Sequence, residues 1–62
     1  MTGFYRTKSG VVFTVILDKV KGKEVLKRGR YKDFVNRTFS LVTEEVLQQE
    51  LLTGEIEKIC NQ

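Results

Sequence analysis

Basic side chains crowd one stretch of the chain, and they offer its clearest chemistry. Eight of the eleven Lys and Arg residues lie within residues 19–37, with Tyr31 and Phe34 among them. Small β proteins bind single-stranded nucleic acid with such a set, phosphates on Lys or Arg and bases stacked on aromatic rings. We therefore expect a nucleic-acid surface formed by Lys27, Arg28, Arg30, Tyr31, Lys32 and Arg37.

Two other interpretations of the basic segment remain open. A Lys-rich hairpin can serve only to keep a sheet soluble and to discourage pairing of its edge with another chain. The same charge could also attract an acidic protein.

Residues suited to catalysis or to metal binding are scarce. The chain has no His, and its one cysteine, Cys60, can form neither an internal disulfide nor a zinc set. Two pairs of acids are close in sequence, Glu44 with Glu45 and Glu55 with Glu57, but neighbours on a helix point apart. We expect no enzyme activity, no metal and no cofactor.

The charge is divided unevenly along the chain. Residues 1–37 hold ten basic and three acidic side chains, whereas residues 38–62 hold one basic and five acidic side chains. This predicts one domain over residues 1–62, with a basic β-sheet region at 1–42 and an acidic helical tail at 43–60. An acidic helix folded back over a basic sheet would neutralise part of that surface.

Glycines separate short runs of β-branched and aromatic residues in the basic half. Residues 4–7 predict a first strand, with a turn at Ser9-Gly10. Residues 11–17 are apolar on both faces of a strand, which predicts a central strand covered on each side. Residues 18–23 form a charged connection, and residues 24–28 predict a third strand.

Gly29-Arg30 fits a two-residue hairpin loop, followed by a returning strand over residues 31–37. In that register Val25 lies opposite Phe34, and Arg28 lies opposite Tyr31. Lys27 would then face Lys32, and the two would repel unless an anion lay between them.

The acidic half carries the signals of a helix. Thr43 is a suitable N-cap, and Glu44 and Glu45 follow it where a helix N-terminus favours negative charge. Leu47 and Leu51 are spaced to face a core.

A second apolar stripe, formed by Leu52, Ile56 and Ile59, allows two interpretations. Gly54 could end the helix near Thr53, so that the following residues pack separately. Alternatively one longer helix buries two sides, the second against another subunit.

The chain resembles small SH3-like barrel proteins of phages and prophages. The resemblance is carried by residues 5–15, by the Gly-turned basic hairpin and by Phe39 leading to Thr43-Glu44-Glu45. The similarity spans about residues 4–47. It implies a strongly bent five-stranded sheet and a binding role. The strand run is also similar to the KOW segment of ribosomal and transcription-elongation barrels, although its glycines are placed differently.

These observations predict an α+β or mainly β fold, a small antiparallel SH3-like barrel or curved sheet of four to five strands with one C-terminal helix. The expected function is nucleic-acid binding. The alternative is a phage-type inhibitor or adaptor that binds a host protein through the sheet or the stripe Leu52, Ile56 and Ile59. We expect a cytoplasmic protein without a signal peptide or membrane span. Its small core also suggests a homodimer.

Overall fold

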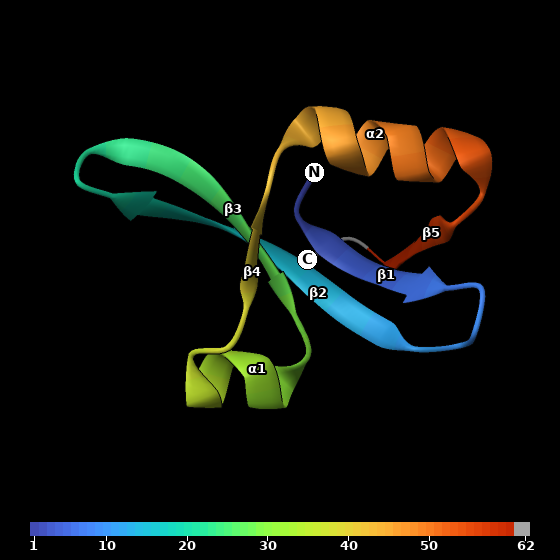
Figure 1. Cartoon of the computed structure of the whole chain (residues 1–62), viewed down its shortest axis with the longest axis horizontal. Coiled ribbons are helices and arrows are strands. Elements are labelled where there is room, and N and C mark those ends of the chain that lie inside the picture. Colours follow the sequence, from blue (N-terminus) through green and yellow to red (C-terminus); the bar gives the residue numbers. More distant parts are fainter. Residues whose placement is uncertain (61–62) are drawn as a thin grey trace.

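The computed structural model describes residues 1–60, which form one five-stranded antiparallel sheet and two helices (Figure 1). The elements are β1 (Gly3–Thr7), β2 (Val12–Val20), β3 (Lys23–Gly29), α1 (Tyr31–Asn36), β4 (Ser40–Val42), α2 (Glu44–Thr53) and β5 (Ile56–Cys60). The strand order is β4-β3-β2-β1-β5, so β2 is central as predicted.

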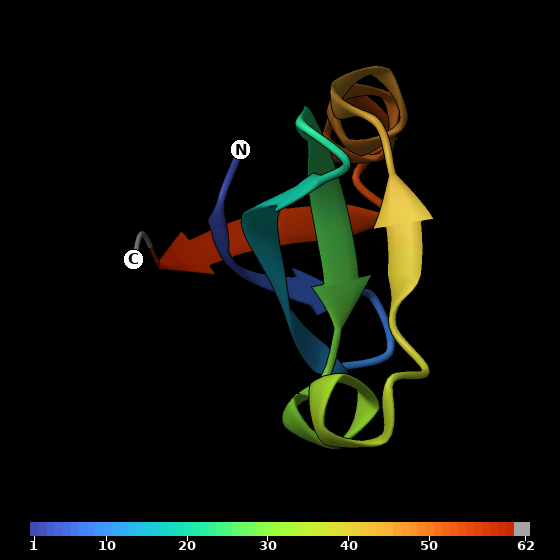
Figure 2. The same cartoon turned by 90° about the vertical axis from the view of Figure 1, so that its left-hand side faces the viewer.

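The sheet is open, with β4 and β5 as its two edges. The broad prediction of an α+β or mainly β fold is confirmed, but the strands do not close into a barrel. The prediction of a single C-terminal helix is also wrong, because residues 1–60 form two helices, α1 and α2. They lie at opposite ends of the molecule (Figure 2). Neither helix described in residues 1–60 is long and apolar enough to cross a membrane.

One face of the sheet carries the core. Tyr5 and Phe13 stand opposite each other on β1 and β2, and their rings stack with centroids 5.5 Å apart. The Tyr5 hydroxyl donates to the Met1 carbonyl at 2.6 Å, and burial raises the pKa of Tyr5. Val15, Leu26, Ile56 and, from α2, Leu47 complete this buried cluster.

The other face of β2 is only partly covered, which corrects the prediction that the strand is covered on each side. Side chains alternate along a strand, so Val12, Thr14 and Ile16 point away from Phe13 and Val15. Val12 is exposed, and Thr14 and Ile16 are half-buried. Within residues 1–60, α2 contributes Leu47 to the core, whereas α1 contributes no buried residue.

The hairpin between β2 and β3 turns at Lys21-Gly22, where φ is 52° and 78°. Two consecutive positive φ values are typical of a tight two-residue hairpin turn. The strands therefore continue to Val20 and Lys23, and most of the charged connection predicted at residues 18–23 is strand.

The predicted hairpin at Gly29-Arg30 is wrong, because residues 31–36 are helical. The backbone N–H of Arg30 donates to the Asp33 carboxylate at 2.8 Å, which caps the first turn of α1. A Cβ at Gly29 would lie 2.9 Å from the Asp33 Cβ, so the glycine permits close approach of the helix. None of the predicted cross-strand pairs forms, and Lys27 instead lies opposite Ile16 and Leu41.

The prediction of an N-cap at Thr43 and a break at Gly54 is confirmed. The Thr43 hydroxyl accepts from the Val46 N–H at 3.2 Å, and Gly54 adopts a φ of 78° at the helix end. The acidic tail is therefore not helical to residue 60, because Ile56–Cys60 forms β5 beside β1. The alternative of one longer helix is wrong.

Candidate nucleic-acid interface

Lys27 lies on β3, and its ammonium group is held by an acid and an aromatic ring. Its Nζ donates to Asp18 Oδ2 at 2.7 Å and lies 4.6 Å from the centre of the Phe39 ring. The side chain is 16% exposed. The hydrogen bond from Lys27 is the main reason that the pKa of Asp18 lies below its usual range. Lys27 is thus engaged in an ion pair at the protein surface, because the Asp18 side chain is 49% exposed.

Arg28 points to the opposite face of β3, toward the core. Its Nη1 donates to Glu50 Oε1 on α2 at 2.6 Å, and its guanidinium lies 4.2 Å from the centre of the Phe13 ring. The two charged side chains are only 24% and 23% exposed. The acidic helix therefore neutralises part of the basic sheet, and Arg28 is a structural contact between β3 and α2.

The other four predicted residues gather around α1. Arg30 precedes the helix and Tyr31 and Lys32 begin it, whereas Arg37 ends it with a φ of 59°. All four are exposed, and the Tyr31 side chain is the most open of the large hydrophobic residues, at 84%. Within residues 1–60, Lys32 and Arg37 make no ion pair.

A pocket of about 390 Å³ lies between α1 and the strands β1 and β2. Its lining consists of Phe4, Val12, Phe13, Thr14, Arg30, Tyr31 and Phe34. Phe34 is backed by Phe39, with ring centroids 5.6 Å apart and planes 18° from parallel. The pocket thus combines apolar walls with one guanidinium and one exposed phenol ring, a chemistry that suits a flat aromatic ligand.

Sequence reasoning missed Phe4 and Val12 as lining residues. Phe4 lies opposite Thr14 in the sheet, and Val12 lies on the same face of β2 as Thr14. The signal was present in residues 11–17, which are apolar on both faces of a strand, because one of these faces had to lie away from the core.

The charge at α1 is positive. The backbone N–H of Arg30 is the main cause of the lowered pKa of Asp33, so this carboxylate is ionised at neutral pH. Its Oδ2 lies 3.7 Å from Arg30 Nε and offsets part of that charge. Residues 30–37 hold three basic side chains and one acidic side chain, which leaves a net charge of +2. Arg30 is the basic residue of this segment that lines the pocket, and Lys32 and Arg37 lie nearby in sequence.

The apolar stripe predicted at Leu52, Ile56 and Ile59 is not a surface of the folded chain. Leu52 is exposed on α2, whereas Ile56 is 3% exposed in the core and Ile59 lies on β5. The stripe depended on a continuous helix, and the break at Gly54 separates its members.

The part of the chain that the structure describes contains no group of three or more His, Cys, Asp or Glu residues placed to hold a metal ion. No family model, curated protein or solved structure matches this chain. The functional argument therefore rests on the residues themselves.

Proposed function

We propose that this protein binds single-stranded nucleic acid through α1 and the aromatic pocket beside it. One observation carries the proposal: an exposed tyrosine ring, Tyr31, stands at the rim of an aromatic pocket next to Arg30, with Lys32 and Arg37 close by in sequence. Bases would stack on Tyr31 or enter the pocket, and phosphates would bind the three basic side chains.

Several features support a single strand over a duplex. A base can enter a pocket only when it is free of its own stack, as in single strands, loops and ends. The six-residue α1 is also short for a helix that reads the major groove, where several side chains along one helix face contact base edges.

The salt dependence follows from the number of phosphates. If Arg30, Lys32 and Arg37 each neutralise one phosphate, the slope of log affinity against log salt is about −2 on single strands. A basic patch that included Lys27 and Arg28 would give a steeper slope, about −3.5. The slope therefore separates the surface formed at α1 from the larger surface predicted from sequence.

The test is a fluorescence anisotropy titration of labelled single- and double-stranded DNA and RNA. Replacing Tyr31 by Ala should weaken binding about 5- to 150-fold, because base–aromatic stacking contributes about 1–3 kcal/mol. Tyr31→Phe keeps the ring and should bind normally. Lys32→Ala should reduce affinity and flatten the salt slope, whereas Lys8→Ala, in the exposed turn after β1, is the matched control. Absence of binding at low salt would refute the proposal.

The alternative function is an adaptor that binds a host protein through the sheet or through Leu52, Ile56 and Ile59. The second route needs a continuous surface made by these three residues, and Ile56 is only 3% exposed. No observation favours that route over the interface at α1.

A further inference from the structure

The outer half of the β2–β3 hairpin extends beyond the rest of the sheet (Figure 1). β1 pairs with β2 only over Val12 to Val15, and β4 pairs with β3 only over Leu26 to Arg28. Residues 18–20 and 23–25 therefore form a two-stranded ribbon without a neighbouring strand among residues 1–60. A two-stranded ribbon alone is marginally stable in water, so a surface that covers it would stabilise it.

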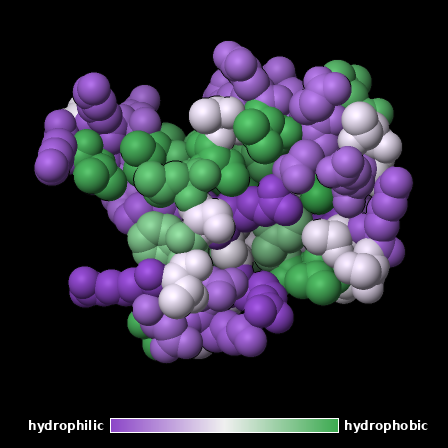
Figure 3. Space-filling view, in the orientation of Figure 1, coloured by the Kyte–Doolittle hydropathy of each residue, from purple (hydrophilic) through white to green (hydrophobic). Residues whose placement is uncertain are grey.

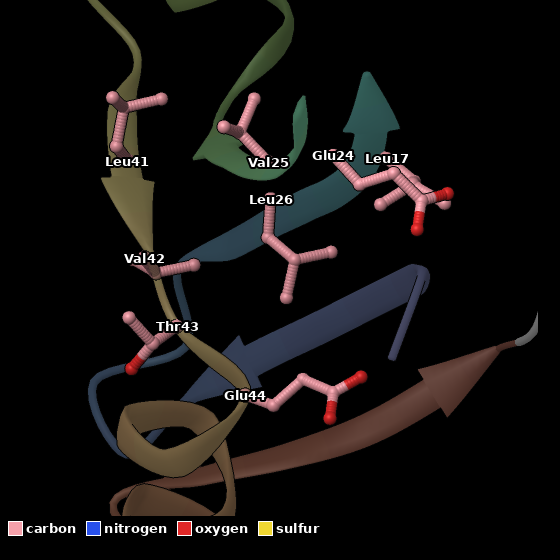
Figure 4. A pocket seen from close by; sticks show the side chains of 8 residues that line it. All are labelled: Leu17, Glu24, Val25, Leu26, Leu41, Val42, Thr43 and Glu44. Carbon is pink, nitrogen blue, oxygen red and sulfur yellow. The ribbon is translucent and has the colours of Figure 1, made fainter. Parts of the chain in front are cut away.

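An apolar groove lies between this ribbon and the start of α2. It has a volume of about 490 Å³ and is lined by Leu17, Glu24, Val25, Leu26, Leu41, Val42, Thr43 and Glu44 (Figure 4). Leu17 is 51% exposed, and Leu41 is also exposed. Figure 3 shows hydrophobic residues as a band that runs from the hairpin toward α2. Such a contiguous apolar surface is typical of an interaction site.

The charged residues that line the groove, Glu24 and Glu44, are both acidic, whereas the ribbon tip beyond the groove is basic. Lys21 and Lys23 lie at the ribbon tip, whereas Glu44 and Glu45 begin α2 at the other end. Lys19 and Glu24 stand opposite each other and offset one another. A two-fold rotation brings the basic ribbon tip of each copy to the acidic start of α2 in the other copy, so the same contact forms at both ends of the groove. The charges around the groove are therefore complementary to those of a second copy.

We propose that a second copy of this chain docks in the groove and forms a two-fold symmetric dimer. The apolar band around Leu17 is buried between the copies, and Lys21 of each copy faces the acidic start of α2 in the other. Burial of apolar area drives the association, and the end charges select the antiparallel orientation. This inference is independent of nucleic-acid binding, because α1 lies at the end of the molecule away from α2 (Figure 1).

Sedimentation velocity of the full chain over a range of concentrations tests the dimer. We expect a reversible monomer–dimer equilibrium that salt weakens. Leu17→Arg should raise the dimer dissociation constant at least about tenfold, because it places a charge in the apolar contact. Leu52→Arg, at an exposed position on α2 outside the groove lining, is the matched control and should dimerise normally. Circular dichroism verifies that both variants fold.

A charge exchange makes the test specific. Glu44→Lys and Lys21→Glu should each weaken self-association, because like charges then meet at both ends of the dimer. An equimolar mixture of the two variants should restore the dimer, since every contact again joins opposite charges. A wild-type chain that stays monomeric at all concentrations refutes the proposal, whether or not another protein binds the groove. Failure of the mixture to restore a dimer refutes the proposed orientation.

Discussion

Arg28 provides the sharpest contrast between the structure and the basic surface predicted from sequence. Its ion pair with Glu50 joins β3 to α2, and its guanidinium covers Phe13. Arg28→Met removes the charge and keeps an apolar stem. The charge-assisted hydrogen bond contributes about 1.5–3 kcal/mol and the cation–π contact about 0.5–2 kcal/mol. After repacking of the Met side chain, we expect the free energy of unfolding to fall by about 2 kcal/mol.

A double-mutant cycle isolates the pair. Arg28→Met combined with Glu50→Gln should show a coupling energy of about 1–2 kcal/mol, because the pair is largely removed from water. The matched control is the ion pair between Arg6 and Glu57, whose side chains are 50% and 59% exposed. Its cycle should give well under about 1 kcal/mol, the usual range for surface pairs.

Urea unfolding followed by circular dichroism measures both cycles, and anisotropy measures nucleic-acid affinity of the same variants. Arg28→Met should lower stability while the affinity of the folded protein stays within about twofold of wild type, a change of under about 0.5 kcal/mol. Equal coupling in the two cycles would contradict the structural role assigned to Arg28. So would a loss of affinity as large as that of Tyr31→Ala in a folded variant.

Three further predictions concern the fold. Leu47→Ala, in the middle of the core, should cost about 2–5 kcal/mol in urea unfolding, and a chain this small would be left largely unfolded. Gly54→Ala should cost about 1 kcal/mol in the same assay, because φ is 78° at this position, whereas a cost near zero would contradict the conformation. The pKa of Asp33 lies below its ordinary value of 3.8, because it accepts the Arg30 N–H. Its stabilising effect is therefore present above that value and is lost as the pH falls through the lower folded pKa. In Asp33→Asn the free energy of unfolding should fall less steeply with decreasing pH below about pH 4. The same pH dependence as in the wild type would contradict this cause.

Much of the fold could be predicted because its signals are local. The N-cap at Thr43 and the C-cap at Gly54 each depend on a single residue type at a helix end. The first three strands follow from runs of β-branched and aromatic residues between glycines. Their observed bounds extend the predicted ones by one to three residues at most ends.

The elements that sequence missed depend on contacts between distant or unexpected residues. α1 is capped by Asp33, whose side chain reaches back to Arg30, and it lies against Gly29. The hairpin prediction rested on the glycine alone, because Gly in the first position is typical of a two-residue hairpin loop. β5 pairs with β1 some fifty residues earlier, and that pairing cannot be read from residues 55–60 themselves.

Contacts with distant residues also explain why only part of the candidate site could be predicted from the sequence. Arg30, Tyr31, Lys32 and Arg37 are all exposed, at or next to the two ends of α1. Lys27 and Arg28 are instead bound by acids 9 and 22 positions away in the chain, Asp18 and Glu50. The count of basic residues therefore overstated the free positive surface.

Tyrosine fluorescence tests the central claim most directly. The chain has two tyrosines and no tryptophan, so in a Tyr5→Phe variant Tyr31 is the only strong emitter. Titration with single-stranded RNA or DNA, corrected for nucleic-acid absorbance, should quench this emission as bases stack on the ring, with a midpoint that shifts with salt. Emission that stays constant while anisotropy shows the nucleic acid bound, or the absence of any binding at low salt, would contradict the account.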